Sequence, residues 1–181
     1  MAVLAVILVA TVFRVLPHWP NFTPLAAIAL MSGAFIQSKR LALLVPILAL
    51  FISDLVTLTW INTEWTSVSG FFGSPGTALI YLAFFLMTLI GFQLRKRQSS
   101  GALALSALSS SILFFLLSNF GVWMINNLPK DLSGLMQTYA LGIPFFGYDL
   151  AGNIFYTFVG FGLIRVMVQQ WPILREERIN G

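Results

Sequence analysis

The chain has 181 residues, of which 58% are hydrophobic and only 9% charged, with a formal net charge of +4. A soluble domain of this length needs far more charge to cover its surface, so the composition excludes an ordinary soluble protein. The apolar residues come in long blocks, which excludes the short alternating strands of an outer-membrane barrel. With no cysteine and one histidine, disulfides, thiolate chemistry and a zinc site are excluded as well.

Six apolar runs predict six transmembrane helices, because crossing the hydrocarbon core of a bilayer takes about 20 residues. In chain order the runs cover residues 2–16, 24–36, 41–61, 77–94, 101–125 and 148–168. The first two are short, so we expect a tilted or broken pair. A signal peptide in the first run is disfavoured, because no basic residue precedes the apolar stretch. No linker divides the chain, and we predict one all-α integral membrane domain over residues 1–181.

The basic residues predict the orientation of these helices. With the amino terminus inside, eight basic residues fall on the cytoplasmic side: Lys39, Arg40, Arg95, Lys96, Arg97, Arg165, Arg175 and Arg178. Only Arg14 and Lys130 fall on the opposite side. By the positive-inside rule both termini are cytoplasmic. Because the positive charge is distributed as topology signals and forms no single patch, we expect the lipid bilayer and no nucleic acid as a partner.

The segment between the fifth and sixth runs predicts an extracytoplasmic amphipathic helix. Apolar residues recur there at helical spacing: Leu132, Leu135, Met136, Tyr139, Ala140 and Ile143. Pro129 precedes the pattern, and Gly142 and Pro144 close it, which is typical of a helix lying on the membrane surface. Such a helix either covers a cavity as a lid or plugs the end of the bundle. The aromatic loop 62–76 on the same side is either a second gate or an interfacial aromatic belt.

Asp54 lies at membrane depth in the outer half of the third run. A carboxylate near the bilayer centre costs about 2.5–3.5 kcal/mol on insertion scales, so such residues face the bundle interior or water. Arg14, on the same side of the membrane, is the candidate ion-pair partner. Asp54 therefore either forms a structural pair with Arg14 or contacts a ligand.

Two polar stripes follow the fifth and sixth runs at helical spacing. The first consists of Asn119, Trp123 and Asn126, and the second of Asp149, Asn153, Tyr156 and Gly160. Each stripe alone is explained by hydrogen bonds between packed helices. Together with Asp54 they favour an outward-open cavity between spans three, five and six, roofed by the helix around Tyr139. Polar groups in an apolar, aromatic hollow are what a small-molecule site requires.

No catalytic constellation is visible in the sequence. His18 stands alone near prolines, and no nucleophile elbow, HExxH or P-loop occurs. We therefore expect no enzyme activity, no cofactor and no metal site. Without a nucleotide-binding motif the chain cannot energise active transport alone.

Four segments carry a family resemblance: RVLPHWPNFTPLAA at 14–27, PILALFISDL at 46–55, FFLLSNFGVW at 114–123 and IPFF at 143–146. The chain resembles, over most of its length, a family of small bacterial membrane proteins related to the S components of energy-coupling-factor (ECF) transporters. The blocks PNFTP and SNFGVW are the most specific. The resemblance implies six helices in the bacterial inner membrane with cytoplasmic termini. It also implies a vitamin or metal bound from outside and an ECF-type energising module as partner.

The chain departs from the S components at two points. The solitary cobalamin-binding type, which looks closest, uses a cysteine as cobalt ligand, and this chain has none. His18 would be the one strong nitrogen ligand left, which puts cobalamin in doubt. S components that dock on a shared coupling protein often carry small residues four apart on the first helix. Here Ala29 and Gly33 in the second run supply such a pair.

The sequence thus predicts a substrate-binding membrane subunit, or a solitary transporter, for a small vitamin-like molecule. The candidate binding residues are Asp54, Asn119, Trp123, Tyr139, Asp149 and Asn153, with Arg14 and His18 at the mouth. Asp54 and the asparagines would hydrogen-bond the ligand, and the aromatic rings would stack on it. The alternatives are a non-transporting membrane scaffold, whose polar stripes only join helices, and an intramembrane enzyme.

Overall fold

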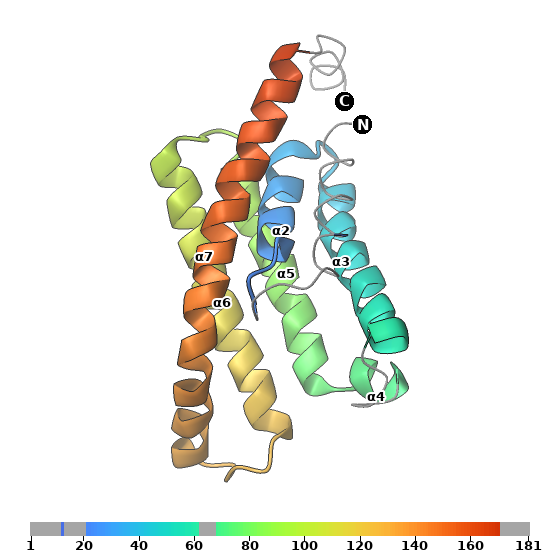
Figure 1. Ribbon diagram of the computed structural model, residues 1–181, viewed down its shortest axis with the longest axis vertical. Helices are drawn as coiled ribbons and strands as arrows, with labels where there is room; N and C mark the ends of the chain where they lie inside the picture. The colour runs from blue at the N-terminus through green and yellow to red at the C-terminus, as the bar shows by residue number, and fades with distance from the viewer. Residues whose placement is uncertain (1–11, 13–20, 62–67, 171–181) are drawn as a thin grey trace.

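The computed structural model describes residues 12, 21–61 and 68–170, and every regular element in these ranges is helical (Figure 1). The elements are α2 (Leu25–Phe35), α3 (Lys39–Val56), the π-helical turn η1 (Thr57–Ile61), α4 (Val68–Phe72), α5 (Pro75–Gln93), α6 (Ser100–Ile125) and α7 (Leu132–Gln170). Three of the long helices, α3, α5 and α6, begin after a serine: Ser38, Ser74 and Ser99. Each serine hydroxyl accepts a backbone N–H of the first turn, which is the usual N-cap interaction.

Four helices are long and apolar enough to cross a membrane: α3 with the start of η1, α5, α6 and α7. Leucine, isoleucine and phenylalanine side chains stand exposed along them, as lipid-facing helices require. The protein is therefore an α-helical membrane protein. The predicted runs 41–61, 77–94 and 101–125 begin and end within two residues of α3–η1, α5 and α6. The predicted run 2–16 lies outside the described residues except for Val12.

The surface helix predicted between spans five and six does not exist as a separate element. Residues from Leu132 to Gln170 form one continuous helix, α7, about 58 Å long by the helical rise. Gly142 lies inside this helix. A Cβ at position 142 would lie 2.2 Å from Oδ1 of Asn119 in α6, so the glycine is explained by close packing between the two helices. Pro144 also lies inside the helix. A proline removes one backbone hydrogen bond, which neighbouring helices in a membrane bundle can tolerate. The two residues that predicted a helix end are thus interior positions.

The second predicted run, 24–36, forms the short helix α2. Its 11 residues reach only about 16 Å, too short to cross a bilayer. Every residue from Leu25 to Ala34 is buried, as expected for a helix that is apolar on all sides. In Figure 1, α2 lies among the longer helices, in front of α5 and between α7 and α3. The helix is the centre of the bundle rather than a span at its edge.

The backbones of α2 and α5 touch through two glycines. A Cβ on Gly33 would lie 2.3 Å from the carbonyl oxygen of Thr88, and one on Gly91 would lie 2.5 Å from that of Leu30. Real Cβ contacts do not come this close, so both positions require glycine. Small residues let membrane helices approach closely enough to gain dispersion contacts that lipid cannot match. The Ala29–Gly33 pair singled out in the sequence is therefore used inside the protein.

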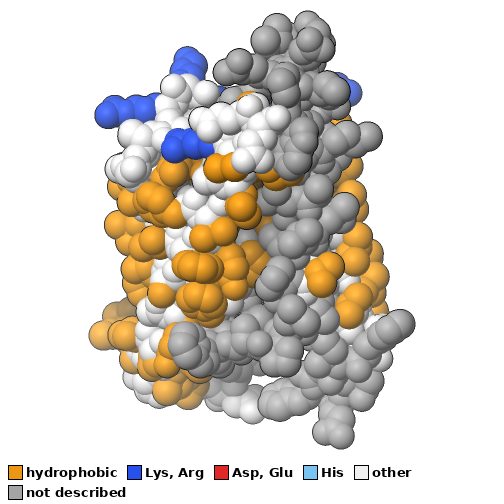
Figure 2. All heavy atoms as spheres, turned by 45° about the horizontal axis from the view of Figure 1, so that its top comes forward, with side chains coloured by type: hydrophobic (Ala, Val, Ile, Leu, Met, Phe, Trp, Pro, Cys, Tyr) orange, Lys and Arg blue, Asp and Glu red, His pale blue; other side chains and the backbone are white. Residues whose placement is uncertain are grey.

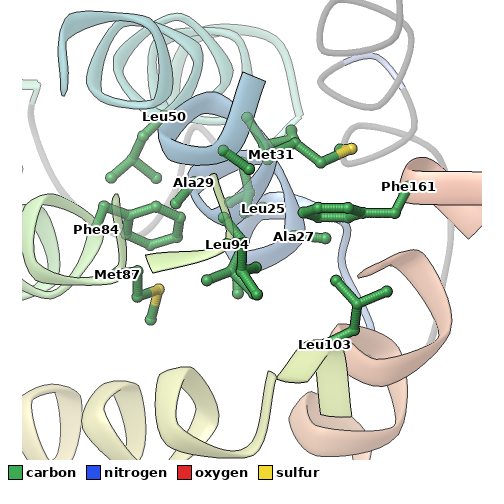
Figure 3. Packing of buried hydrophobic residues seen from close by; sticks show 14 of the residues in the cluster. Leu25, Ala27, Ala29, Met31, Leu50, Phe84, Met87, Leu94, Leu103 and Phe161 are labelled. Atoms are coloured by element: carbon green, nitrogen blue, oxygen red, sulfur yellow. The ribbon is translucent and has the colours of Figure 1, made fainter. Parts of the chain in front are cut away.

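Side chains from the surrounding helices complete the core around α2. Figure 3 shows Leu50, Phe84 and Met87 on one side of α2 and Leu103 and Phe161 on the other. All five are at most 3% exposed. The Phe161 ring of α7 lies 4.8 Å from that of Phe35 at the end of α2.

Arg95, just after α5, holds the carboxyl end of α2. Its Nε donates to the carbonyl of Gly33 at 2.8 Å, and its Nη atoms donate to those of Ile36 at 2.6 Å and Gln37 at 3.3 Å. The last carbonyls of a helix lack intrahelical partners. A cation there satisfies them and complements the negative end of the helix dipole. Arg95 thus both marks the end of a span and anchors the central helix.

All but one of the described basic residues gather at one end of the bundle (Figure 2). These are Lys39, Arg40, Arg95, Lys96, Arg97 and Arg165. Lys130, in the loop between α6 and α7, lies at the opposite end. Figure 2 shows hydrophobic side chains over the side of the bundle below the basic end. The charge distribution therefore distinguishes the two ends of the protein.

The α2–α5 contact makes a direct stability prediction. Gly33→Ala should lower the thermal unfolding midpoint in detergent, at a cost of about 1–3 kcal/mol, because the new methyl group forces two backbones apart. Gly162→Ala in α7 is the matched control, since a Cβ there meets nothing within 4 Å. It should be neutral or slightly stabilising. Equal loss in both variants would contradict the proposed packing.

Candidate functional site

A cavity of about 400 Å³ lies at the amino-terminal end of α2, above the lower limit of about 300 Å³ typical of small-molecule sites. Its walls come from α2, α3, η1, α4, α5, α6 and α7. The described residues that line it are Asn21, Thr23, Leu25, Ala26, Leu50, Asp54, Thr57, Leu58, Phe71, Thr77, Ile80, Phe84, Met87, Phe114 and Asp149. The sequence predicted a cavity between spans three, five and six. The prediction left out α2 and α5, which supply much of the wall. The cavity is mostly apolar and contains two carboxylates.

Asp54 is one of these carboxylates, in the last turn of α3. Its side chain is only 5% exposed. The hydroxyl of Tyr81, from α5, donates a hydrogen bond to Asp54 Oδ2 at 3.1 Å. The bond fixes the carboxylate against α5 while it still lines the cavity. Tyr81 is a site residue that the sequence did not reveal, because a tyrosine in an apolar run is indistinguishable there from an interfacial anchor.

A π-helical turn directly follows Asp54. In η1 the helix widens over Thr57–Ile61, and Thr57 and Leu58 line the cavity. The Thr57 hydroxyl donates to the carbonyl of Ser53 at 2.8 Å. Single π-turns inside helices are rare and are frequent at functional sites, where they change the direction of side chains. The turn therefore coincides with the cavity wall.

Asp149 of α7 is the second carboxylate. Ser111 of α6 lies beside it within hydrogen-bonding reach. The Oδ2 atom of Asp149 is inaccessible to solvent and has no hydrogen-bond partner in the part of the chain that the structure describes. Nearly all buried polar atoms in proteins have a partner, so an orphan calls for an explanation. Asp149 is thus held at the cavity wall with unused hydrogen-bonding capacity.

A second cavity of about 390 Å³ adjoins the first between α6 and α7. It shares Asn21, Ile80 and Phe114 with the first cavity. Its other described lining residues are Ser118, Asn119, Val122, Asn126, Thr138, Leu141, Gly142 and Phe145. Asn119 Nδ2 donates to the carbonyl of Phe115 in its own helix at 2.8 Å. Of the candidate residues, Asp54 and Asp149 thus share one cavity, and Asn119 lies in its neighbour.

Two aromatic candidates, Trp123 and Tyr139, hydrogen-bond to backbone carbonyls and are not among the described residues that line either cavity. The indole Nε1 of Trp123 donates to the carbonyl of Pro129 at 3.0 Å, which holds the α6–α7 loop. The hydroxyl of Tyr139 donates to the carbonyl of Leu116 at 2.7 Å, which joins α7 to α6. The predicted stacking role instead falls to phenylalanines. Phe84 and Phe114 line the main cavity with ring centroids 6.2 Å apart, edge to face.

Asn153 joins helices and does not reach either cavity. It is 1% exposed, and its Nδ2 donates to the carbonyl of Ala107 at 2.8 Å and to Ser111 Oγ at 3.2 Å. This is the interhelical hydrogen bonding that the sequence left as the alternative. The two mouth residues, Arg14 and His18, lie outside the described residues. The Arg14–Asp54 pair therefore stays a prediction.

Metal-binding clusters of three or more His, Asp or Glu are absent from residues 21–61 and 68–170. The main cavity nevertheless offers oxygen atoms of several kinds, including the hydroxyls of Thr57 and Thr77. Thr77, at the start of α5, donates its hydroxyl to the carbonyl of Phe71 in α4 at 2.7 Å. That bond ties the short helix α4 to the cavity rim. Phe71 of the aromatic loop thereby becomes part of the cavity wall.

Comparison with known proteins identifies the family of the chain. Residues 1–174 match the family model described as "Family of unknown function (DUF6580)". The chain belongs to this family, because the match covers nearly its whole length. No curated protein and no solved structure gives a significant match. The description of the family gives no function, so the function is inferred from the site.

The contrast between the two asparagines makes a testable prediction. Asn153→Ala should lower the unfolding midpoint, at a cost of about 1–2 kcal/mol, because it removes buried hydrogen bonds between α6 and α7. Asn119→Ala should cost less, since the bond that its side chain makes among the described residues stays within α6, and the residue borders a cavity. Differential scanning fluorimetry of both variants in one detergent provides the measurement. A larger loss for Asn119→Ala would show that Asn119 is the structural residue.

Proposed function

We propose that this member of a family of unknown function is a membrane-embedded binding protein for a small organic molecule. It acts either as the substrate-binding subunit of a transporter or as a solitary transporter. The observation that carries the proposal is the cavity of about 400 Å³ lined by Asp54 and Asp149 among apolar and aromatic side chains. Small-molecule sites have this size and this combination of an apolar wall with a few polar groups.

The position of the cavity supports binding from the extracytoplasmic side. The cavity lies near the carboxyl end of α3 and the amino ends of α2 and α5. Lys39 and Arg40 begin α3, and Arg95 follows α5, so the basic end is the opposite end of the bundle. The positive-inside rule assigns the basic end to the cytoplasm. The cavity then faces the outside of a bacterial inner membrane, where uptake begins.

A scaffold is the second candidate, and the side chains that only join helices favour it. Asn153, Tyr139 and Trp123 use their polar groups on backbone carbonyls of α6 or the following loop. A pure scaffold, however, gains nothing from Asp149, whose Oδ2 lacks a partner among the described residues. A charged group in a membrane domain is costly and normally marks a substrate or ion pathway. Binding therefore accounts for more of the observed polar groups than scaffolding does.

The resemblance to S components supports uptake of a vitamin-like molecule with the help of an energising module. The Ala29–Gly33 pair is not available to such a module, because both residues are buried against neighbouring helices. Any docking surface lies on the outer faces of the long helices. The proposal therefore includes a coupling partner without assigning it to the small-residue pair.

Native mass spectrometry of gently purified protein tests the proposal. The wild type should carry a co-purified small molecule. Ile80→Trp should lose it, because Ile80 lines both cavities and the larger ring fills the hollow. Leu82→Trp is the matched control on the same helix, since Leu82 is 43% exposed and points outward. Both variants are first checked for a single symmetric elution peak.

Two results would contradict the binding proposal. One is a wild type that carries only lipid and binds no member of a library of vitamins and their precursors. The other is an Ile80→Trp variant that retains the bound molecule as fully as Leu82→Trp. Either result would leave the scaffold as the better account.

A further inference from the structure

The second cavity, between α6 and α7, is polar but has no charged side chain among the described residues that line it. Lys130 follows α6, but its Nζ donates to the carbonyls of Trp123 and Asn126 and to Asn126 Oδ1. A charged ligand would lose its hydration in this cavity without a counter-ion from the described wall. The hydrogen-bonding side chains of the wall are those of Asn21, Ser118, Asn119, Asn126 and Thr138.

Two of these side chains, Asn126 and Thr138, are already bonded within the protein. Asn126 Nδ2 donates to Thr138 Oγ1 at 3.0 Å, and its Oδ1 accepts the backbone N–H of Leu128 at 3.1 Å. The Thr138 hydroxyl donates in turn to the carbonyl of Gly134 at 2.9 Å. These bonds join α6, the following loop and α7 beside the cavity. The role of this pair is therefore structural.

Ser118 and Asn119 have hydrogen-bonding capacity that the described chain does not use. Ser118 Oγ and Asn119 Oδ1 have no hydrogen-bond partner in residues 21–61 and 68–170. The described side-chain atoms that are both unpartnered and shielded from solvent are Ser110 Oγ and Asp149 Oδ2. Ser118 Oγ and Asn119 Oδ1 are not among these shielded atoms. A ligand in the second cavity can therefore reach both of them.

The amide of Asn119 is held in one place by its neighbours. Its Nδ2 donates one N–H to the carbonyl of Phe115 at 2.8 Å. A Cβ on Gly142 would lie 2.2 Å from Asn119 Oδ1 and 2.9 Å from Nδ2, so the amide lies against the backbone of α7. One N–H donor and one oxygen acceptor remain on this amide. A partner group that carries both an acceptor and a donor matches them.

The second cavity also borders the lipid-facing surface. Val122, Leu141 and Phe145 of its wall are exposed. An acyl chain that entered between α6 and α7 would leave the polar atoms of Ser118 and Asn119 without partners in hydrocarbon, which is costly. A ligand with its own donor and acceptor avoids that cost.

We propose that the second cavity is a subsite for an uncharged group of the carboxamide type, which both donates and accepts hydrogen bonds. The group bonds to Ser118 and Asn119. Asn21, Ile80 and Phe114 line both cavities, so one molecule extends from the main cavity into the second. The inference rests on the proposed binding function and adds the chemical class of the part of the ligand that binds here.

Three probes of nearly equal shape test this class. Benzamide is uncharged and carries a donor and an acceptor, acetophenone is uncharged and lacks the donor, and benzoate is negative. Binding is measured by ligand-observed NMR with the full chain in phosphatidylcholine nanodiscs, and nanodiscs without the protein give the contribution of the lipid. Benzamide should bind at least about tenfold more tightly than acetophenone or benzoate, because only benzamide satisfies the polar wall without a charge.

Alanine variants test the assigned residues. Ser118→Ala and Asn119→Ala should each weaken benzamide binding by about tenfold and reduce its preference over acetophenone. Ser109→Ala is the matched control, since Ser109 is a partly buried serine of the same helix that lines neither cavity. It should bind benzamide as the wild type does. Unfolding midpoints show whether each variant is folded, and either binding variant alone suffices should the other fail to fold.

The outcomes separate this inference from the proposed function. Acetophenone or benzoate bound as tightly as benzamide would overturn the carboxamide class. Benzamide affinity that is the same in Ser118→Ala, Asn119→Ala and Ser109→Ala would overturn the subsite, and so would failure of benzamide to bind at millimolar concentration. The proposed function would survive each of these results if the wild type carries a co-purified molecule that Ile80→Trp loses.

Discussion

The backbones of α2 and α5 touch at Gly33 and Gly91, and the rest of the bundle depends on that contact. Inside a bilayer, helices gain no hydrophobic energy by associating, so close packing and satisfied hydrogen bonds must hold them together. A central helix of 11 residues is too short to reach both membrane surfaces. The last carbonyls of α2 have no partner within the helix. Arg95, just after α5, donates three hydrogen bonds to carbonyls at this end of α2. These bonds join α2 to α5 in addition to the glycine contact.

The short central helix also determines where the cavity lies. The long helices continue past the amino-terminal end of α2, and the first residues of α2, Leu25 and Ala26, line the hollow found there. At the other end of α2 the core is filled by Phe161, Leu94 and Leu103. The bundle is therefore tightly packed toward its basic end and hollow toward the opposite end. This asymmetry supports the proposed binding function.

Two carboxylates in this hollow are costly, at about 2.5–3.5 kcal/mol each near the bilayer centre. The protein offsets part of that cost with Tyr81 on Asp54 and Ser111 beside Asp149. It does not offset all of it within the described residues, since Asp149 Oδ2 has no partner there. Side chains that only join helices, such as Asn153, show that this chain can satisfy a buried polar group completely. In the described part of the chain, Asp149 Oδ2 and Ser110 Oγ are buried without a hydrogen-bond partner, and Asp149 is the one of the two residues that lines the main cavity.

Three of the long helices could be read from the sequence, because apolar runs of about 20 residues report membrane crossing directly. The sequence also predicted that Asp54 and Asp149 line one cavity, because carboxylates at membrane depth normally face the bundle interior or water. The roles of Trp123, Tyr139 and Asn153 were not.

A helical stripe shows which face a residue occupies but not which neighbour that face meets. Gly142 and Pro144 were taken for a helix end, because the contact of Gly142 with Asn119 is a tertiary contact that the sequence does not show. The same limit concealed Tyr81 and Phe114, whose importance comes only from the cavity they border.

Single-cysteine labelling tests the central claim, an aqueous cavity open to the non-basic side, most directly. The chain contains no cysteine, so Thr57→Cys places one thiol in the cavity wall. Gly101→Cys places one at the basic end, where a Cβ meets nothing within 4 Å. A membrane-impermeant cationic methanethiosulfonate is added to bacterial spheroplasts. We expect Thr57→Cys to react in intact spheroplasts and Gly101→Cys to react only after permeabilisation. A Thr57→Cys thiol that stays unreactive, or reacts only after permeabilisation, would contradict the account.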